Sequence, residues 1–146
     1  MELGPYGAGL NAARWDKGAS MGEYALRDSR LLWPDRCGVL PYKDATMSAI
    51  YQRMVALCLL GGYAPIGGME VALPTGNADI DAEAQRLTRA GKEIEARRGM
   101  LRGWCAHPFL IDAAQTPFQE LRASDWTPGP ELTQLAGDHV FLQRPE

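Results

Sequence analysis

The sequence predicts an α/β fold in which helices flank parallel strands, because short apolar or glycine-rich segments alternate with helical ones. The clearest strand candidates are residues 37–42 (CGVLPY) and 64–73 (APIGGMEVAL). Helical patterns follow each of them, at residues 44–60 and 79–98. We expect one α/β domain, since 146 residues is the size of an ordinary single domain.

The helix over residues 44–60 is predicted by its spacing of apolar residues, which recur at helical intervals on one face. Asp44 is placed as its N-terminal cap and Gly61-Gly62 as its stop. The apolar face consists of Met47, Ile50, Tyr51, Met54, Val55 and Cys58.

The helix over residues 79–98 is also amphipathic. The expected buried stripe is Ile80, Ala84, Leu87, Ala90 and Ile94. The expected solvent side is Asp81, Glu83, Lys92, Glu93 and Glu95. Gly99 and Gly103 are expected to end this helix before a short strand at residues 104–106 (WCA).

The two ends of the chain are less regular. A short segment at residues 10–16 precedes an expected helix at residues 19–30. From Ser124 onward, Pro128, Gly129 and Pro130 break any periodicity, so residues 124–146 are treated as a tail.

Composition excludes several classes of partner. The net charge of −3 gives no electrostatic footprint for nucleic acid or for an anionic membrane. The longest apolar run, residues 54–63, is far shorter than the roughly 20 residues that span a bilayer. Three cysteines without metal-binding spacing indicate buried thiols in a reducing compartment. We therefore expect a cytoplasmic protein.

Four blocks, in order along residues 2–110, give the chain a resemblance to the malate synthase family. Residues 2–16 contain EL, AGLN and RWD, which resemble the family pattern EL…AGLNCGRWD. Residues 34–39 (PDRCGV) resemble LPDR..V, and residues 66–74 (IGGMEVALP) resemble IGGMAA.IP. Residues 92–108 contain KE, EA and GWCAHP, which resemble DKEREA…GTWVAHP.

The resemblance implies a fold. The family has a (β/α)8 TIM barrel with an added C-terminal domain, and the matched blocks belong to its later strands. We therefore expect residues 1–123 to form a partial barrel, about its second half, and residues 124–146 to be an unmatched tail. On this reading the chain is a fragment or a truncated homologue.

The resemblance also implies a reaction and a site. The family condenses glyoxylate with acetyl-CoA and water, using Mg²⁺, to give malate and CoA in the glyoxylate cycle. It implies that Asp16 is a Mg²⁺ ligand at the carboxyl end of a barrel strand. It further implies that backbone amides around Arg14, Trp15 and Asp16 bind the glyoxylate carboxylate. From the residues alone, Asp16 is instead a helix cap.

Other matched residues have two interpretations. Ala13 stands where the family has Gly, so its Cβ would disturb the site if that Gly is there to adopt positive φ or to admit substrate. Gly67 and Gly68 let the backbone approach either acyl-CoA and the barrel interior or a packed helix. His107 is expected to be a hydrogen-bonded structural residue. Core positions are expected for Trp15, Trp33 and Trp104.

No catalytic residue is assigned, and no residue is assigned to CoA. The family chemistry needs an Arg on an early strand, a second carboxylate on Mg²⁺ and an Asp base in the C-terminal domain. The matched blocks hold no counterpart of these, so we expect no activity from the chain alone. The open edges of a half barrel would favour self-association or pairing with a complementary chain.

Two alternatives stay open. The chain is either part of an enzyme or a non-catalytic remnant, a pseudoenzyme with residual CoA or Mg²⁺ affinity. A third reading is an acyl-CoA enzyme of the citrate-lyase-like group, such as a malyl-CoA lyase. The RWD and PDR blocks argue against this third reading.

Overall fold

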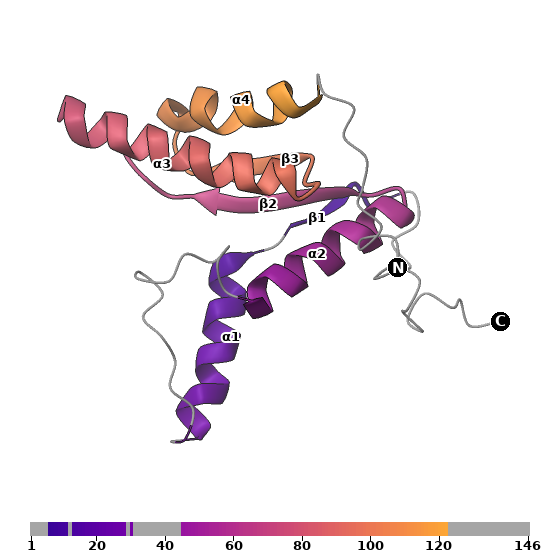
Figure 1. The fold of residues 1–146 in the computed structure, drawn as a ribbon. Coiled ribbons are helices and arrows are strands. Elements are labelled where there is room, and N and C mark those ends of the chain that lie inside the picture. Colours follow the sequence, from indigo (N-terminus) through magenta and orange to yellow (C-terminus); the bar gives the residue numbers. More distant parts are fainter. Residues whose placement is uncertain (1–5, 12, 29, 31–44, 123–146) are drawn as a thin grey trace.

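The structure, a computed structural model, describes residues 6–11, 13–28, 30 and 45–122 (Figure 1). Its elements are, in order, β1 (Gly9–Asn11), α1 (Arg14–Arg27), α2 (Ala45–Leu60), β2 (Ala64–Glu70), α3 (Ala78–Arg97), β3 (Arg102–Cys105), the 3-10 helix η2 (Pro108–Leu110) and α4 (Ile111–Arg122). No helix in this part of the chain is long and apolar enough to cross a membrane. The expected strand at residues 37–42, the Asp44 cap and the tail at residues 124–146 lie outside the described residues.

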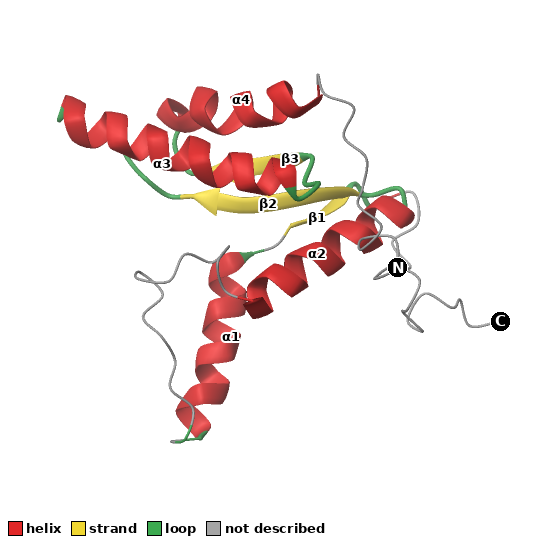
Figure 2. Cartoon of the chain, in the orientation of Figure 1, coloured by secondary structure: helices red, strands yellow, loops and turns green. Residues whose placement is uncertain are grey.

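The described strands form a parallel sheet with the order β1-β2-β3, so each pairs with the next described strand along the chain (Figure 2). Parallel neighbours need long crossover connections, which α1 and α2 provide between β1 and β2 and α3 provides between β2 and β3. Consecutive parallel strands with flanking helices are the arrangement found in part of a (β/α)8 barrel. The prediction of a partial barrel is confirmed.

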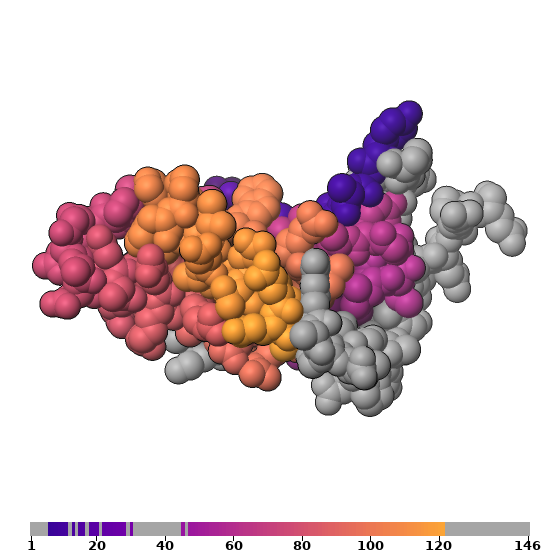
Figure 3. Space-filling model, turned by 90° about the horizontal axis from the view of Figure 1, so that it is seen from above, coloured from indigo at the N-terminus to yellow at the C-terminus, as the bar shows by residue number. Residues whose placement is uncertain are grey.

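Helices α2, α3 and α4 share one hydrophobic core beside the sheet. Its buried members are Met47, Tyr51, Val55, Ala96, Met100 and Phe118. Helices α3 and α4 lie side by side (Figure 3), above the strands in the view of Figure 1. An ion pair of 2.8 Å between Arg89 and Glu120 joins their exposed surfaces. Helix α1 extends away from this layer (Figure 1).

The prediction for α2 is confirmed. The helix begins at Ala45 and ends at Leu60, where the backbone turns through Gly62 at a φ of 73°. On its expected apolar face, Ile50 and Met54 are half-buried and the others are buried. One of these is Cys58, and burial raises the pKa of its thiol. Cys105 is half-buried.

The predicted orientation of α3 is wrong. Of the expected buried stripe, Ile80, Leu87, Ala90 and Ile94 are exposed and Ala84 is half-buried. Lys92 and Glu95, which were expected in solvent, are completely buried. The buried residues of α3 are instead Thr88, Lys92, Glu95 and Ala96.

The space for these long side chains comes from glycines in the strands. A Cβ at Gly67 would lie 1.9 Å from Glu95 Oε2, and one at Gly103 would lie 2.9 Å from Lys92 Cδ. Two opposite charges that neutralise each other can occupy an interior position where the hydrophobic pattern predicts apolar residues. The pattern therefore selected the wrong face of the helix.

Several element boundaries also differ from the predictions. Strand β2 ends at Glu70 rather than at residue 73, and β3 occupies Arg102–Cys105, so Gly103 lies within the strand. Gly99 does end the α3 region, at a φ of 92°. Helix α4 was not predicted, and it contains Pro117.

We expect Gly67→Ala to destabilise the fold by at least about 3 kcal/mol, because its Cβ would displace Glu95 from a buried ion pair. Gly18→Ala is the matched control, since Gly18 lies in α1 and no atom lies within 4 Å of the position that its Cβ would take. That control should stabilise the chain by roughly 0.5–1 kcal/mol. Urea unfolding of both variants measures the difference, and equal midpoints would contradict the packing described.

The pH dependence of the turn before α3 follows from Asp81. Its carboxylate accepts hydrogen bonds from the Thr75 N–H at 2.8 Å, the Thr75 hydroxyl at 2.8 Å and the Gly76 N–H at 3.2 Å. These bonds, led by the Thr75 N–H, hold the pKa of Asp81 below its usual range. A lowered folded pKa gives stabilisation that is complete above the unfolded pKa and is lost as the pH falls through the folded pKa.

We therefore expect a carbon-detected NMR titration of Asp81 to have its midpoint below the ordinary aspartate range. Thr75→Val removes the hydroxyl donor and should raise that midpoint. An unchanged midpoint in the variant would show that the hydroxyl bond contributes nothing.

Candidate functional site

The junction between β1 and α1 contains the three residues predicted to bind metal and substrate. Strand β1 ends at Asn11, and Arg14, Trp15 and Asp16 form the first turn of α1. The turn therefore follows the carboxyl end of a parallel strand, where (β/α)8 barrels build their sites. Asp16 is exposed and Trp15 is 44% exposed, whereas the Arg14 side chain lies outside the described part.

The expected helix over residues 19–30 begins five positions earlier, at Arg14. The N-cap is Ala13, which makes no side-chain capping bond, so the interpretation of Asp16 as a helix cap is wrong. Asp16 is instead the acidic residue within the first turn. A carboxylate there interacts favourably with the positive end of the helix dipole.

The backbone at Ala13 is unstrained. Its φ is −67° and its ψ is 97°, an extended conformation that any L-residue adopts. No non-glycine residue in the described ranges has positive φ. The Cβ of Ala13 therefore meets no conformational penalty at this junction.

The first turn of a helix can attract an anion. The first N–H groups of a helix have no partner within the helix, and the dipole makes this end positive. Asp16 adds a hard oxygen donor, of the kind that Mg²⁺ prefers. In the part of the chain that the structure describes, no group of three or more His, Cys, Asp or Glu side chains could hold a metal ion.

A second cluster, which we call the α3 clamp, consists of Lys92 and Glu95 on α3. Both side chains are fully buried, and Lys92 Nζ lies 2.9 Å from Glu95 Oε2. Lys92 also donates to the Gly68 carbonyl, while Glu95 Oε1 accepts from the Gly68 N–H at 3.1 Å. The two glycines of β2 thus allow helix packing, the second of their two interpretations.

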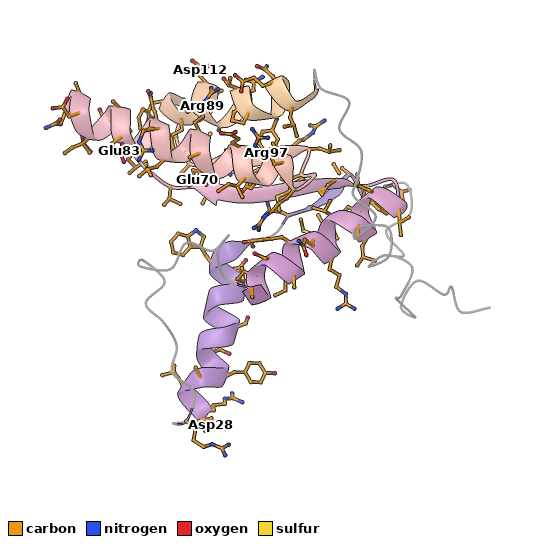
Figure 4. The ribbon with its side chains drawn as sticks, viewed as in Figure 1. Asp28, Glu70, Glu83, Arg89, Arg97 and Asp112 are labelled. Carbon is orange, nitrogen blue, oxygen red and sulfur yellow. The ribbon has the colours of Figure 1, made fainter. Side chains whose placement is uncertain are left out.

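A further carboxylate meets the α3 clamp at the carboxyl end of β2. Glu70 Oε1 lies 3.6 Å from Lys92 Nζ, and the Glu70 side chain is 20% exposed. Figure 4 shows Glu70 at the end of β2, on the side of α3. Sequence reasoning missed this cluster because it placed Lys92 and Glu95 in solvent. The available signal was the pair of glycines, Gly67 and Gly103, on neighbouring strands.

The aromatic and histidine predictions have different outcomes. His107 Nδ1 accepts from the Phe109 N–H at 3.2 Å, so the expected hydrogen bond is confirmed. Trp15 and Trp104 are 44% and 54% exposed, so their assignment to the core is wrong in the described structure. Trp33 lies outside the described residues. Trp104 is exposed because Gly103 takes the strand position that faces Lys92, and alternation turns its neighbour to the opposite face.

We expect Lys92→Met to lower the free energy of unfolding by about 3–5 kcal/mol, since Glu95 would remain buried without its cation. Arg97→Met is the matched control on the same helix. It removes the exposed Arg97–Glu93 pair of 2.7 Å and should cost only about 0.3–0.5 kcal/mol. Chemical denaturation compares the two, and similar losses would argue against a buried pair.

Comparison with known proteins gives a consistent result. The family model for the malate synthase TIM-barrel domain matches residues 1–141. A malate synthase of Myxococcus xanthus is 32% identical over 118 residues, which cover 80% of this chain and 22% of that protein. The corresponding protein of Streptomyces clavuligerus is 35% identical over 124 residues, with the same coverage. Malate synthase A of Escherichia coli strain K12 is 29% identical over 124 residues, again covering 80% and 22%.

The chain thus spans about a fifth of the length of these curated relatives, as the 22% coverage shows. No solved structure matches it significantly.

Proposed function

Because the chain belongs to the malate synthase family, as part of its TIM-barrel domain, we propose that it provides the glyoxylate- and Mg²⁺-binding turn of a malate synthase site. The reaction would condense glyoxylate with acetyl-CoA and water to malate and CoA. The observation that carries this proposal is the position of Asp16, exposed in the first turn of α1 directly after a parallel strand. A cytosolic role in the glyoxylate cycle is part of the same proposal.

The residues present suit Mg²⁺ in part. Magnesium in enzymes is commonly held by one or two carboxylates, with waters and substrate as the other ligands. Asp16 supplies one such carboxylate, and the described residues offer no larger ligand group. A bound Mg²⁺ would polarise the glyoxylate aldehyde and offset negative charge on its oxygen.

The electrostatics of the turn make the two ligands interdependent. The first-turn N–H groups attract the glyoxylate carboxylate, but the Asp16 carboxylate in the same turn repels it. A divalent cation on Asp16 removes that repulsion. Glyoxylate binding should therefore require Mg²⁺, and the requirement should depend on Asp16.

We propose that the 146-residue chain by itself does not turn over acetyl-CoA and glyoxylate. A positioned general base contributes roughly 10²–10⁴ to such a rate, and the matched blocks contain no counterpart of the family base. Strands β1 and β3 are the edge strands of the described sheet, which supports pairing with a second copy or a complementary chain.

Calorimetric titration with MgCl₂ and glyoxylate at millimolar concentrations tests the proposal. The wild-type chain should bind glyoxylate only with Mg²⁺ present. The Asp16→Ala variant should not bind Mg²⁺, and its glyoxylate binding should not depend on Mg²⁺. Asp28→Ala is the control, because Asp28 lies at the opposite end of α1 and pairs with Arg30 (Figure 4).

The absence of binding in the wild type would instead favour a non-catalytic remnant. Release of CoA from acetyl-CoA by purified chain, lost in Asp16→Ala, would contradict the expected inactivity.

A further inference from the structure

Strand β2 contains a β-bulge at its two central glycines. Ile66 pairs with Arg102 and Met69 pairs with Trp104, so two residues of β2 lie opposite the single residue Gly103 of β3. A bulge of this kind leaves backbone groups outside the regular ladder. Those groups need other partners, since buried backbone N–H and C=O groups are nearly always hydrogen-bonded. Gly67 and Gly68 are both buried.

Side chains from two different elements bind the bulge. From α3, Glu95 Oε1 accepts from the Gly68 N–H at 3.1 Å, and Lys92 Nζ donates to the Gly68 carbonyl. From β1, Asn11 Nδ2 donates to the Gly67 carbonyl at 2.6 Å. The bulge is thus held by the α3 clamp and by Asn11 together.

The α3 clamp has little freedom to rearrange. Both of its side chains are 0% exposed and are joined to each other at 2.9 Å. The Glu95 carboxylate already lies against the Gly67 backbone, since a Cβ built on residue 67 would be 1.9 Å from Glu95 Oε2. Glu95 therefore has no room to move closer to β2. The Gly68 peptide is therefore fixed by a rigid, charge-assisted pair of hydrogen bonds.

Asn11 is the last residue of β1, and α1 begins three positions later at Arg14. Its bond to Gly67 sets where the chain leaves the sheet before the first turn of α1. A continuous series of hydrogen bonds consequently runs from the α3 clamp, through the bulge, to Asn11, three positions before the start of the helix that contains Asp16.

From this series we propose that Lys92 and Glu95 are positioning residues for the Asp16 turn, acting through the Gly67–Gly68 bulge and Asn11. The inference rests on the proposed function for its consequence, which is tight binding of glyoxylate with Mg²⁺. Its structural part, the coupling of the α3 clamp to Asn11, is independent of that function.

The test uses the full chain with Lys92→Met, Asn11→Ala and the double variant, all titrated with glyoxylate at saturating MgCl₂. Each single change should weaken glyoxylate binding by roughly 10–100-fold, as loss of a supporting hydrogen bond behind a ligand-binding group does. If both residues act along one series, the double variant should bind glyoxylate with about the affinity of the single variant that binds it less tightly. Arg97→Met, on the exposed side of α3, should leave the dissociation constant unchanged.

A second readout separates positioning from general loss of stability. In ¹H–¹⁵N spectra recorded well below the melting temperature, Lys92→Met should shift both the Gly68 amide signal and the Asn11 side-chain amide signals. Arg97→Met should shift neither. If Lys92→Met does not fold, Glu95→Gln takes its place, because it keeps the shape of the side chain while it removes the charge and one of the two oxygen acceptors.

Three results would overturn the inference. One is a folded Lys92→Met chain with unchanged glyoxylate affinity, and another is a double variant whose loss is the product of the two single losses. The third is an Asn11 side-chain signal that does not respond to the α3 clamp. If wild-type chain binds no glyoxylate, the proposed function fails, and the Asn11 signal alone then decides whether the coupling exists.

Discussion

The buried ion pair between Lys92 and Glu95 is the interaction on which the packing of α3 against the sheet depends. Such a pair adds little net stability, because desolvation of the two charges offsets most of their attraction. Its effect here is on which residues can pack at the contact between α3 and the sheet. It requires space at Gly67 and Gly103, and it supplies the partners that the Gly68 peptide lacks within the sheet. A substitute with the same volume but no polar atoms would fill the space and leave the bulge unsatisfied.

The sequence was sufficient for features that depend on local periodicity. The α/β class, the parallel strands and helix α2 follow from the alternation of segments and from apolar residues such as Tyr51 and Val55 at helical spacing. The orientation of α3 was not predictable in this way. Which face of an amphipathic helix is buried depends on the surface it meets, and the surface at Gly67 accepts charged side chains. Helix α4 contains Pro117, a residue that disfavours helix interiors.

For the candidate site, sequence and structure contributed different parts. The position of Asp16 after a strand was implied by the RWD block, and the structure places it in the first turn of α1. The backbone angles of Ala13 were not readable from the sequence, since Gly can also adopt the extended conformation that Ala13 has. The bond from Asn11 to Gly67 joins residues 56 positions apart, and no local pattern signals such a contact.

The order of the strands has a consequence for how a fold of this kind is assembled. Among the described strands, each bonds to the next described strand along the chain, so the contacts within the sheet join segments that follow one another in the sequence. Even the long bond between Asn11 and Gly67 joins two strands that are successive among those the structure describes. Folding can start in one unit and extend to the next at a modest entropic cost. An architecture with this property grows or shrinks at its edges by whole strand–helix units, without rethreading the units that remain.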